Sequence, residues 1–461
     1  MFGGPCERRR RVPELPSVCV IGAGSSGIAV AKEFAERGIP FECFERGDRV
    51  GGNWVFRNRT GTAAAYASLH INTSKRRMAY SDFPMPAPYP DFPHHTQMAA
   101  YFDAYVDHFG VRDRITFGTG VAHAARRDGG GWEVTLDGGE VRNYDALAVA
   151  NGHHWDARWP EPAFPGAFDG ELLHAHDYRD RSQLEGRDVV VLGMGNSAVD
   201  IAVEASHCAS SVTLASRRGA HIVPKYLFGR PTDTLSGSPR VPVWLRRLLF
   251  TGAMRLAVGP VERYGLPKPD HGLGQAHPTI SSDLLNRVVH GRITPKPNIA
   301  RLAGQRVEFV DGTSVPADLL IFATGYRISF PFLDPEVLSA PDNEIGLYHR
   351  VFAPGLPDLA VIGLVQPLGA VMPIAEAQAR WFAAFLLGDY ALPSEAAMRQ
   401  AIRADRERMA RRYVASKRHT IQVDFDDYLL ALARERRAGE RRARAGGPVT
   451  RADVPAGSMM D

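Results

Sequence analysis

Two short apolar runs along the chain are each followed by a glycine-rich turn and an amphipathic stretch. The run at 18–21 precedes the turn GAGSSG at 22–27, and helical periodicity then continues to Arg37. The run at 188–192 precedes the turn GMGNSA at 193–198 in the same way. An apolar strand, a glycine turn and a helix in this order are typical of a dinucleotide-binding unit. The pattern predicts an α/β protein with two Rossmann-like dinucleotide-binding domains.

The first turn has the residue types that a dinucleotide pyrophosphate requires. Gly22 permits a tight turn, Gly24 lets the backbone approach the pyrophosphate, and Gly27 lets helix and strand pack closely. The next strand, FECF at 41–44, leads into Glu45 about 20 residues on, where a carboxylate can accept hydrogen bonds from ribose hydroxyls. The first site therefore favours an unphosphorylated ribose. A glycine turn in an unrelated α/β unit is the alternative.

The second turn differs in its ribose chemistry. Ala198 replaces the third glycine, and the next strand ends in Ser216, Arg217 and Arg218 instead of an acid. Guanidinium groups can grip a 2′-phosphate bidentately, whereas a carboxylate would repel it. The second site therefore favours NADP(H), and a solvated surface turn is the alternative for the two arginines.

Two such sites predict a flavin and a nicotinamide in one protein. NADPH can reduce a flavin, and the reduced flavin can pass electrons to oxygen, a disulfide or a quinone. The absence of a CxxC motif argues against a dithiol centre and against a zinc ribbon. Cys19 and Cys43 fall in apolar runs that predict buried strands, and the remaining cysteines are Cys6 and Cys208.

Composition fits a globular protein with two or three domains. The chain has 461 residues, of which 44% are hydrophobic and 23% charged, and its net charge of +4 comes without an aromatic-and-basic array typical of nucleic-acid binding. The N-terminus has no apolar signal region, and charges interrupt the apolar runs at 244–259 and 370–389. A cytoplasmic location without a transmembrane segment is expected. The 244–259 stretch is consistent with a membrane-surface helix, but a surface helix that packs its leucines inward is the favoured interpretation.

Histidine pairs are the other conspicuous pattern. They lack carboxylate or thiolate partners at ligand spacing, so no metal site is predicted. His174 is instead expected to fasten the linker between the two units. The pairs are His94–His95, His153–His154 and His174 with His176.

Several longer motifs together resemble a known family. They are GGNW at 51–54, NTSK at 72–75, YSDFPMP at 80–86 and the stretch VIGLVQPLGAVMPIAEAQARW at 361–381. The pattern FxGxxxHxxxY is also present, in Phe168, Gly170, His174 and Tyr178. From about residue 17 to 390 the chain is similar to the flavin-containing monooxygenases, which are class B flavoprotein monooxygenases. Related Baeyer–Villiger enzymes usually end the last pattern in Trp, so Tyr178 favours the heteroatom-oxygenating branch.

The resemblance implies a cofactor pair and a reaction. In this family NADPH reduces FAD, O₂ adds at flavin C4a, and the hydroperoxide transfers one oxygen to a nucleophilic nitrogen or sulfur of a small organic substrate. The protein positions these groups and excludes water. Two alternatives stay open: Baeyer–Villiger oxidation of ketones, and an idle FAD- and NADPH-binding protein that releases H₂O₂. The sequence carries no signal for the oligomeric state, although a homodimer would be consistent with it.

The resemblance also implies site residues. Asn72 matches the asparagine that the family places over the flavin, although by sequence alone it would be a turn residue. Val121, in the FGTGV stretch taken as a strand, is expected to meet the adenine through its backbone, and Gln366, in a turn before a helix near Pro373, to lie near the flavin ring. The expected FAD contacts are Gly22, Gly24, Ser26, Gly27, Glu45, Gly52, Asn53, Trp54, Asn72, Thr73, Val121 and Gln366. The expected NADP contacts are Gly193, Gly195, Asn196, Ser197, Ala198, Ser216, Arg217, Arg218, Thr324 and Gly325.

The motif order predicts that the NADP domain is inserted into the FAD domain. The expected FAD domain comprises 1–166 and 324–440, with the NADP domain at 167–323 and a basic, disordered tail at 441–461. The region 226–280 is rich in Gly and Pro and departs from a βαβ rhythm, so it is expected to contribute to the substrate entrance.

Overall fold

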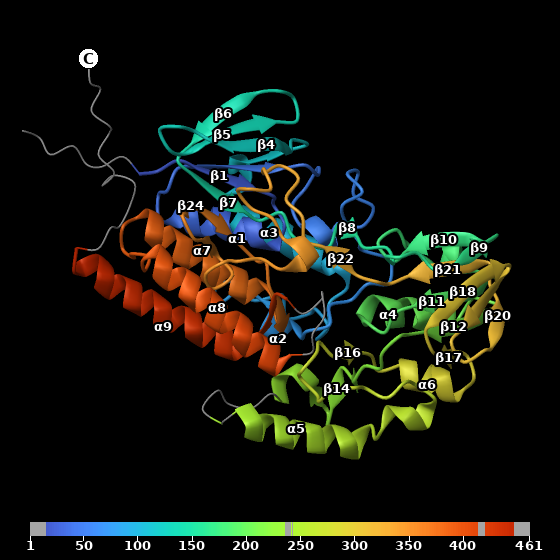
Figure 1. Ribbon diagram of the computed structural model, residues 1–461. Helices are drawn as coiled ribbons and strands as arrows, with labels where there is room; N and C mark the ends of the chain where they lie inside the picture. Colours follow the sequence, from blue (N-terminus) through green and yellow to red (C-terminus); the bar gives the residue numbers. More distant parts are fainter. Residues whose placement is uncertain (1–14, 236–240, 242, 414–419, 447–461) are drawn as a thin grey trace, which may run out of the picture.

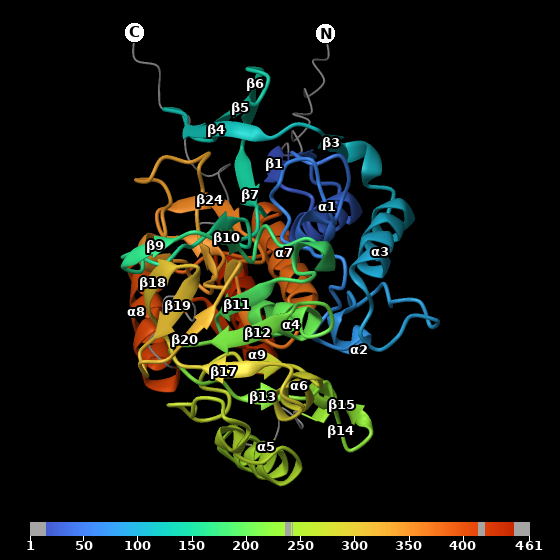
Figure 2. The ribbon, with the colours of Figure 1, turned by 90° about the vertical axis from the view of Figure 1, so that its right-hand side faces the viewer.

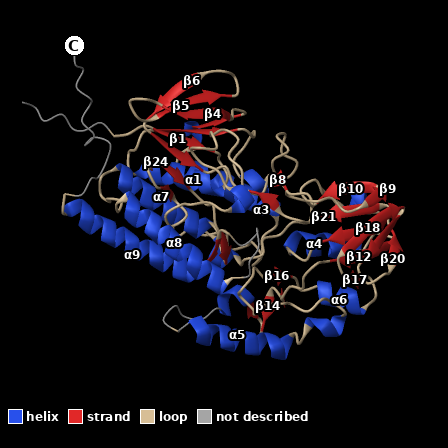
Figure 3. Ribbon diagram, viewed as in Figure 1, coloured by secondary structure: helices blue, strands red, loops and turns tan. Residues whose placement is uncertain are grey.

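Two separate, mainly parallel sheets form the framework of the fold (Figures 1 and 3). The structure is a computed structural model that describes residues 15–235, 241, 243–413 and 420–446. Each sheet contains one strand that leads through a glycine turn into a helix, β1 into α1 and β11 into α4. The α/β class with two Rossmann-like units is confirmed.

The first sheet has β1 (Val18–Ile21) at its centre, paired in parallel with strands on both sides. Val18 and Val20 enter one hydrophobic core and Cys19 and Ile21 the other, because side chains alternate along a strand and both faces are covered. Cys19 and Cys43 are buried, as predicted. The six strands follow the order β23 (Phe352–Ala353), β24 (Leu356–Val361), β7 (Ala146–Val149), β1, β2 (Phe41–Glu45) and β3 (Ile115–Phe117).

Helices cover one face of this sheet and a small antiparallel sheet covers the other (Figure 2). Helix α1 (Ser25–Glu36) lies between the strands and α7 (Met372–Leu386), and α3 (His95–His108) packs beside it. The antiparallel sheet contains β4 (Val121–Arg126), β5 (Trp132–Leu136) and β6 (Val141–Tyr144).

The second sheet is parallel throughout. Its order is β10 (Glu171–His174), β21 (Leu319–Phe322), β11 (Asp188–Leu192), β12 (Ser211–Ala215) and β17 (Thr294–Lys296). Helices α4 (Asn196–Ala205) and α6 (Leu284–Val289) pack on one face. The other face packs against the sheet formed by β20 (Ser314–Pro316), β19 (Arg306–Phe309), β18 (Ile299–Gly304) and β9 (Gly166–Phe168).

Two connecting segments lie side by side between the sheets. The chain leaves the first sheet after β7 and returns to it with β24, after building the second sheet. On the way out β8 (Asp156–Ala157) pairs antiparallel with β22 (Tyr326–Arg327) on the way back. The pairing brings both crossings to one place in the molecule.

The region 226–280 is irregular, as its composition predicts. It contains α5 (Val243–Ala257), which lies along the lower edge in Figure 1. Its other elements are β14 (Tyr226–Leu227), β15 (Arg230–Pro231), η4 (Thr232–Leu235), η5 (Val261–Tyr264) and β16 (Thr279–Ile280), which pairs with β13 (Ile222–Val223).

The expectation that α5 packs its leucines inward is wrong. Leu248, Leu249 and Leu256 are 62%, 64% and 84% exposed. The inward stripe of the helix contains Met254, which is buried, and Arg246, whose guanidinium lies 3.2 Å from a carboxylate oxygen of Asp427. Phe250 and Ala253 pack in the same small core as Met254, and the leucines face outward.

The C-terminal part forms α8 (Glu395–Arg412), β26 (Gln422–Asp424) and α9 (Phe425–Arg444). Arg441–Arg444, expected to begin a disordered tail, are helical instead. Gly439 lets Tyr390 pack against α9, since a Cβ there would lie 1.9 Å from the ring. Arg442 fastens the last turn through its Nε, which donates to the carbonyl of Ala391 at 3.0 Å. The rest of the expected tail from 447, together with Cys6, lies outside the described residues.

No helix within the described ranges is long and apolar enough to cross a bilayer.

Six short elements complete the described fold. They are η1 (Gly52–Trp54), α2 (Lys75–Met78), η2 (Arg112–Arg114), η3 (Arg181–Gln183), η6 (Pro341–Asn343) and β25 (Gln366–Leu368).

Candidate active site

One large cavity lies where the carboxyl ends of the two sheets face each other. It has a volume of about 870 Å³ and is lined by the turns that follow β1, β7, β11 and β21. Residues of the irregular region, among them Phe250, Leu273 and His277, line it as well. A ligand at the carboxyl ends of parallel strands occupies the usual binding position of α/β sheets.

The first glycine turn is held by close backbone contacts. Gly22 has φ +97°, and a Cβ there would lie 2.8 Å from the carbonyl oxygen of Ala150. A Cβ on Gly27 would lie 1.8 Å from the carbonyl oxygen of Gly22, so only glycine lets the helix start this close to the strand. A Cβ on Gly24 would lie 3.7 Å from the Cα of Gly52, which is an ordinary contact distance. The turn thus presents bare backbone and the N-terminus of α1 to the cavity.

Glu45 closes this turn from the end of β2. Its two carboxylate oxygens accept hydrogen bonds from the backbone N–H groups of Ala23 and Gly47, each at 2.7 Å. Each oxygen keeps one free lone pair, and the residue lines the cavity. Glu45 can therefore fix the turn and also accept from a hydroxyl in the cavity.

The second turn repeats this construction at the start of α4. Gly193 has φ +147°, and a Cβ there would lie 2.8 Å from the carbonyl oxygen of Ala323. Asn196 accepts the backbone N–H of Ile280 at 2.8 Å, which ties the turn to the irregular region. The two turns therefore offer two helix N-termini to one cavity.

Asn72 and Thr73 form part of the wall between the turns. The Oδ1 atom of Asn72 is buried and finds no hydrogen-bond partner among the described residues. The Oγ1 of Thr73 donates to the carbonyl of Gly369 at 3.3 Å, and the backbone N–H of Ser74 donates to Asp233 at 2.7 Å. A buried side-chain oxygen without a partner in the cavity wall is suited to accept a hydrogen bond from a polar group inside the cavity.

Most of the residues predicted for the cofactor sites line this cavity. The exceptions are Gly27 and Gly193, which hold the turns from behind, and Ser216, Arg217 and Arg218. The lining set contains Gly22, Gly24, Ser26, Glu45, Gly52, Asn53, Trp54, Asn72, Thr73, Val121, Gly195, Asn196, Ser197, Ala198, Thr324, Gly325 and Gln366.

Two local predictions about these residues are wrong. Gln366 lies in β25, which pairs with β26 of the C-terminal part, and not in a turn. The stretch 117–121 is not one strand: residues 118–120, with Gly118 at φ +65°, connect β3, which ends at Phe117, to β4. Val121 itself begins β4 and lines the cavity.

The FxGxxxHxxxY pattern lies on the second unit, mostly outside the cavity. Tyr178 is fully buried and its hydroxyl donates to Glu204 of α4 at 2.8 Å. A Cβ on Gly170 would lie 2.6 Å from the carbonyl oxygen of Asp318. The Nδ1 of His174 accepts the backbone N–H of His176 at 3.0 Å. Burial lowers the pKa of the His174 imidazole to about 4, so it is neutral at physiological pH. The pattern fixes β10 and the segment after it against α4.

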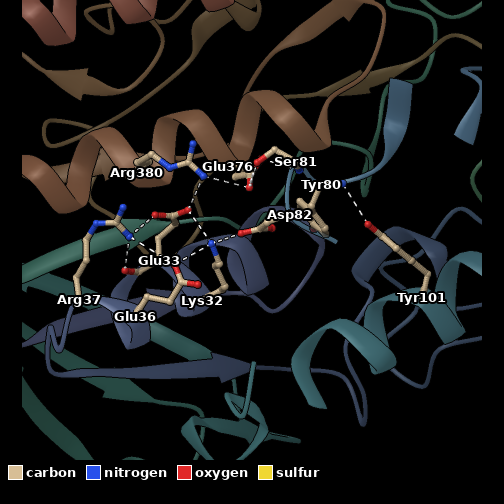
Figure 4. A network of polar contacts seen from close by, with 10 residues as sticks. All are labelled: Lys32, Glu33, Glu36, Arg37, Tyr80, Ser81, Asp82, Tyr101, Glu376 and Arg380. Carbon is tan, nitrogen blue, oxygen red and sulfur yellow. Dashed lines mark hydrogen bonds and ion pairs between the residues drawn. The ribbon is translucent and has the colours of Figure 1, made fainter. Parts of the chain in front are cut away.

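A buried network of charges joins α1, α7 and the loop around Tyr80 (Figure 4). Lys32 is 2% exposed and contacts Glu33, Glu36 and Asp82. Arg380 of α7 bridges Glu33 and Glu376, and Glu376 accepts from the backbone and side chain of Ser81. The Tyr80 hydroxyl donates to the carbonyl of Ser25 at 2.5 Å, at the start of α1. The network braces the first helix behind its glycine turn.

Comparison with known proteins agrees with this geometry. The family model described as flavin-binding monooxygenase-like matches residues 16–438. The chain is 41% identical over 441 residues to flavin-containing monooxygenase 5 of Oryctolagus cuniculus, covering 90% of this chain and 82% of that protein. The chain belongs to the flavin-binding monooxygenase-like family.

Other relatives extend the comparison. Dimethylaniline monooxygenase 2 (N-oxide-forming) of Rattus norvegicus is 35% identical, covering 91% of this chain and 82% of that protein. The S-allyl-L-cysteine S-oxygenase of Allium sativum shares the fold with a TM-score of 0.69 at 24% identity, covering 94% of this chain and 92% of that one. Cyclohexanone monooxygenase shares it with a TM-score of 0.68 at 19% identity, covering 92% and 98%.

As a flavin-binding monooxygenase, the protein is an oxidoreductase that depends on FAD and NADPH and uses O₂. The residues at the cavity fit these cofactors, since two bare glycine turns suit two pyrophosphates and the unpartnered Asn72 suits a polar ring edge. Within the described parts of the chain, no group of three or more metal-ligating side chains is arranged to hold an ion.

The sequence did not reveal Arg158, which lines the monooxygenase cavity beside the second turn. Its Nη2 donates to the carbonyl of Thr324 at 3.0 Å, and its backbone N–H donates to Gly325 at 2.9 Å. Burial lowers the pKa of Arg158, and the charges of Arg327 and Arg217 add to this effect. No motif marks Arg158, because it reaches the cavity through the pairing of β8 with β22.

Proposed function

We propose that this monooxygenase oxygenates nitrogen or sulfur atoms of small organic substrates. One observation carries the proposal: the buried Oδ1 of Asn72, which has no hydrogen-bond partner among the described residues, lies in the wall of a cavity that both glycine turns face. FAD, once reduced by NADPH, supplies the chemistry with O₂. The chain itself positions both dinucleotides and the substrate and excludes water.

We assign FAD to the first turn and NADPH to the second. In this assignment the first turn and Glu45 bind the FAD pyrophosphate and ribose, with Asn53, Trp54 and Val121 along the cofactor. The second turn binds NADPH, and Arg217 and Arg218 grip the 2′-phosphate with Arg158 beside them. The FAD domain then comprises 1–166 and 324–440, and the NADP domain 167–323.

Asn72 is the proposed catalytic positioner. Its Oδ1 accepts and its Nδ2 donates, so the amide can orient a polar group of the flavin or of the nicotinamide. The relative that forms N-oxides supports nitrogen as a target. The cytoplasmic location and the homodimer remain predictions.

A substrate panel tests the proposal. Purified protein with FAD is given NADPH and a matched set of amines, thioethers and ketones, and NADPH consumption is compared with product and H₂O₂. N- or S-oxides in near-stoichiometric yield are expected. Esters from ketones would instead support a Baeyer–Villiger enzyme, and H₂O₂ alone would identify an idle flavoprotein.

A further inference from the structure

Two carboxylates of helix α4 fasten the segment that leads to Asn72. The Tyr66 hydroxyl donates to Asp200 at 2.6 Å, and the Ser68 hydroxyl donates to Glu204 at 2.6 Å. Asp200 and Glu204 lie one helical turn apart, so they point to the same side of α4. The 66–72 segment is thereby held against the helix that starts at the second glycine turn.

The two carboxylates differ in what surrounds them. Asp200 lines the cavity together with Tyr66 and Lys225. Glu204 lies outside the cavity and also accepts the hydroxyl of Tyr178 at 2.8 Å. Only Asp200 therefore combines the fastening of the segment with a position in the wall of the site.

Lys225 holds the same segment from the irregular region. Its Nζ donates to the carbonyl of Ile71 at 3.3 Å, directly before Asn72, and lies 5.1 Å from the ring centroid of Phe92. Burial lowers the pKa of Lys225, while the negative charge of Asp200 favours the charged ammonium. The ionised carboxylate therefore helps to keep Lys225 charged and able to donate.

We propose that Asp200 is a positioning residue for oxygen transfer, which holds Asn72 in place through Tyr66 and Lys225. The inference rests on the proposed role of Asn72. It goes beyond that role because it connects Asn72, in the wall of the proposed FAD site, to α4, which begins at the proposed NADPH site. A displacement of α4 would reach Asn72 through this connection.

The surroundings of Asp200 shift the pKa of its carboxyl toward neutral pH. Burial raises the pKa of Asp200 to about 6, and the charges of Glu204 and Asp283 add to the rise. The hydrogen bond from Tyr66 and the charge of Lys225 oppose it. Because the protonated carboxyl no longer attracts Lys225, the fraction of NADPH converted to product should fall as the pH drops through 6.

The variants Asp200→Asn and Tyr66→Phe test this role. The first removes the charge and the second the hydroxyl donor, without a large change in volume. In the FAD-loaded protein, both should increase amide hydrogen exchange in 66–72 and lower the yield of product per NADPH by roughly tenfold each, the effect of one lost charge-assisted hydrogen bond. Asp200→Asn should also abolish the pH dependence near 6.

Glu204→Gln is the matched control, because it acts on the same helix and segment outside the cavity. It should loosen the amides near Ser68 but leave the product yield at pH 7.5 as in the wild-type protein. Because the charge of Glu204 contributes to the raised pKa of Asp200, the fall in yield should begin at a slightly lower pH in this variant. The proposal is overturned if Asp200→Asn keeps both wild-type exchange and yield, or if Glu204→Gln lowers the yield equally. If the wild-type protein oxygenates no substrate, the proposed function fails, and unchanged exchange in Asp200→Asn still overturns the fastening role.

Discussion

The carboxylate of Glu45 accepts the backbone N–H of Ala23 at 2.7 Å, across the first glycine turn. A second N–H, from Gly47, reaches the other oxygen at 2.7 Å. Two donors to one carboxylate give the turn a fixed shape before any ligand binds, since hydrogen bonds to an ionised acceptor are among the stronger ones in proteins.

Replacing Glu45 with Gln should weaken FAD binding. The amide presents a donor to one of the two N–H groups, so about 1.5–3 kcal/mol is lost and FAD affinity should fall roughly ten- to hundredfold. Fluorescence titration of the apoprotein with FAD measures this loss. Glu42→Gln, on the same strand but paired with Arg142, is the control and should retain FAD. Equal FAD affinity in wild type and Glu45→Gln would show that the turn does not depend on this carboxylate.

The local motifs were predictable because they are contiguous in sequence. The glycine turns and Glu45 belong to short patterns whose geometry follows from neighbouring residues, whereas Asn72 was indicated only through the resemblance to a known family. Asp200 and Arg158 were not predicted, since their roles arise from contacts with Tyr66 and Thr324, which are 134 and 166 residues away in the chain.

The rotation of α5 was unpredictable for a similar reason. Its sequence places leucines and arginines on adjoining faces, and this pattern predicts that the leucines pack against the rest of the protein. The inward side of α5 instead carries Arg246, which contacts Asp427 181 residues later, and Met254, which packs with Val223 and Leu227. Long-range ion pairs of this kind leave no periodic signal in the sequence.

The two arginines after β12 should determine the nicotinamide preference. Both are exposed at the surface, and replacing Arg217 and Arg218 with alanine should reduce NADPH affinity roughly ten- to hundredfold while NADH is unaffected. NADPH and NADH dissociation constants measure the effect. Arg301→Ala, which removes an exposed ion pair with Glu308, is the control. If the ratio of the two affinities is unchanged, Arg158 is the next residue to replace.

The charge network behind the first turn should contribute to stability. Lys32→Met removes the cation that the carboxylates of Glu33 and Asp82 share, while Glu33 keeps Arg37 and Arg380. Breaking a buried ion pair costs about 3–5 kcal/mol, and because Glu33 stays paired the lower value applies, so Tm should fall by roughly 5 °C. Differential scanning calorimetry provides the measurement. Arg399→Met, which removes an exposed pair with Glu395, should change Tm little. A loss of the same size in both variants would contradict the special role of the buried pair.

His174 should make the fold sensitive to acid. Its pKa in the folded protein is about 4, below the ordinary value of 6.5, so between these values the unfolded chain binds a proton that the folded chain does not. Stability is therefore lost as the pH falls through this window, by about 3 kcal/mol in total.

Replacing His174 with Asn should reduce this acid sensitivity, because the amide oxygen can still accept the N–H of His176. The measurement is the difference in Tm between pH 7.5 and pH 5. The exposed His207→Asn serves as the control and should behave like the wild-type protein. An unchanged Tm difference in His174→Asn would assign the acid sensitivity to other groups.

Replacing Asn72 should lower oxygen transfer to the substrate without stopping the oxidation of NADPH. Asn72→Ala leaves both glycine turns intact, so FAD content and NADPH binding should persist. The amide that orients a polar group in the cavity is lost, and water gains access to the vacated space. A preorganised donor of this kind contributes about 2.7–4 kcal/mol where charge develops, and the lower value predicts roughly a hundredfold loss of oxygen transfer.

The measurement compares NADPH consumed, product formed and H₂O₂ released by the wild-type protein and Asn72→Ala. NADPH consumption should continue in the variant, with its electrons diverted to H₂O₂. Asn286→Ala, at an exposed position of α6, controls for the loss of an amide as such. If Asn72→Ala retains the wild-type yield of product per NADPH, the residue only shapes the turn before α2, and the buried Oδ1 has no part in catalysis.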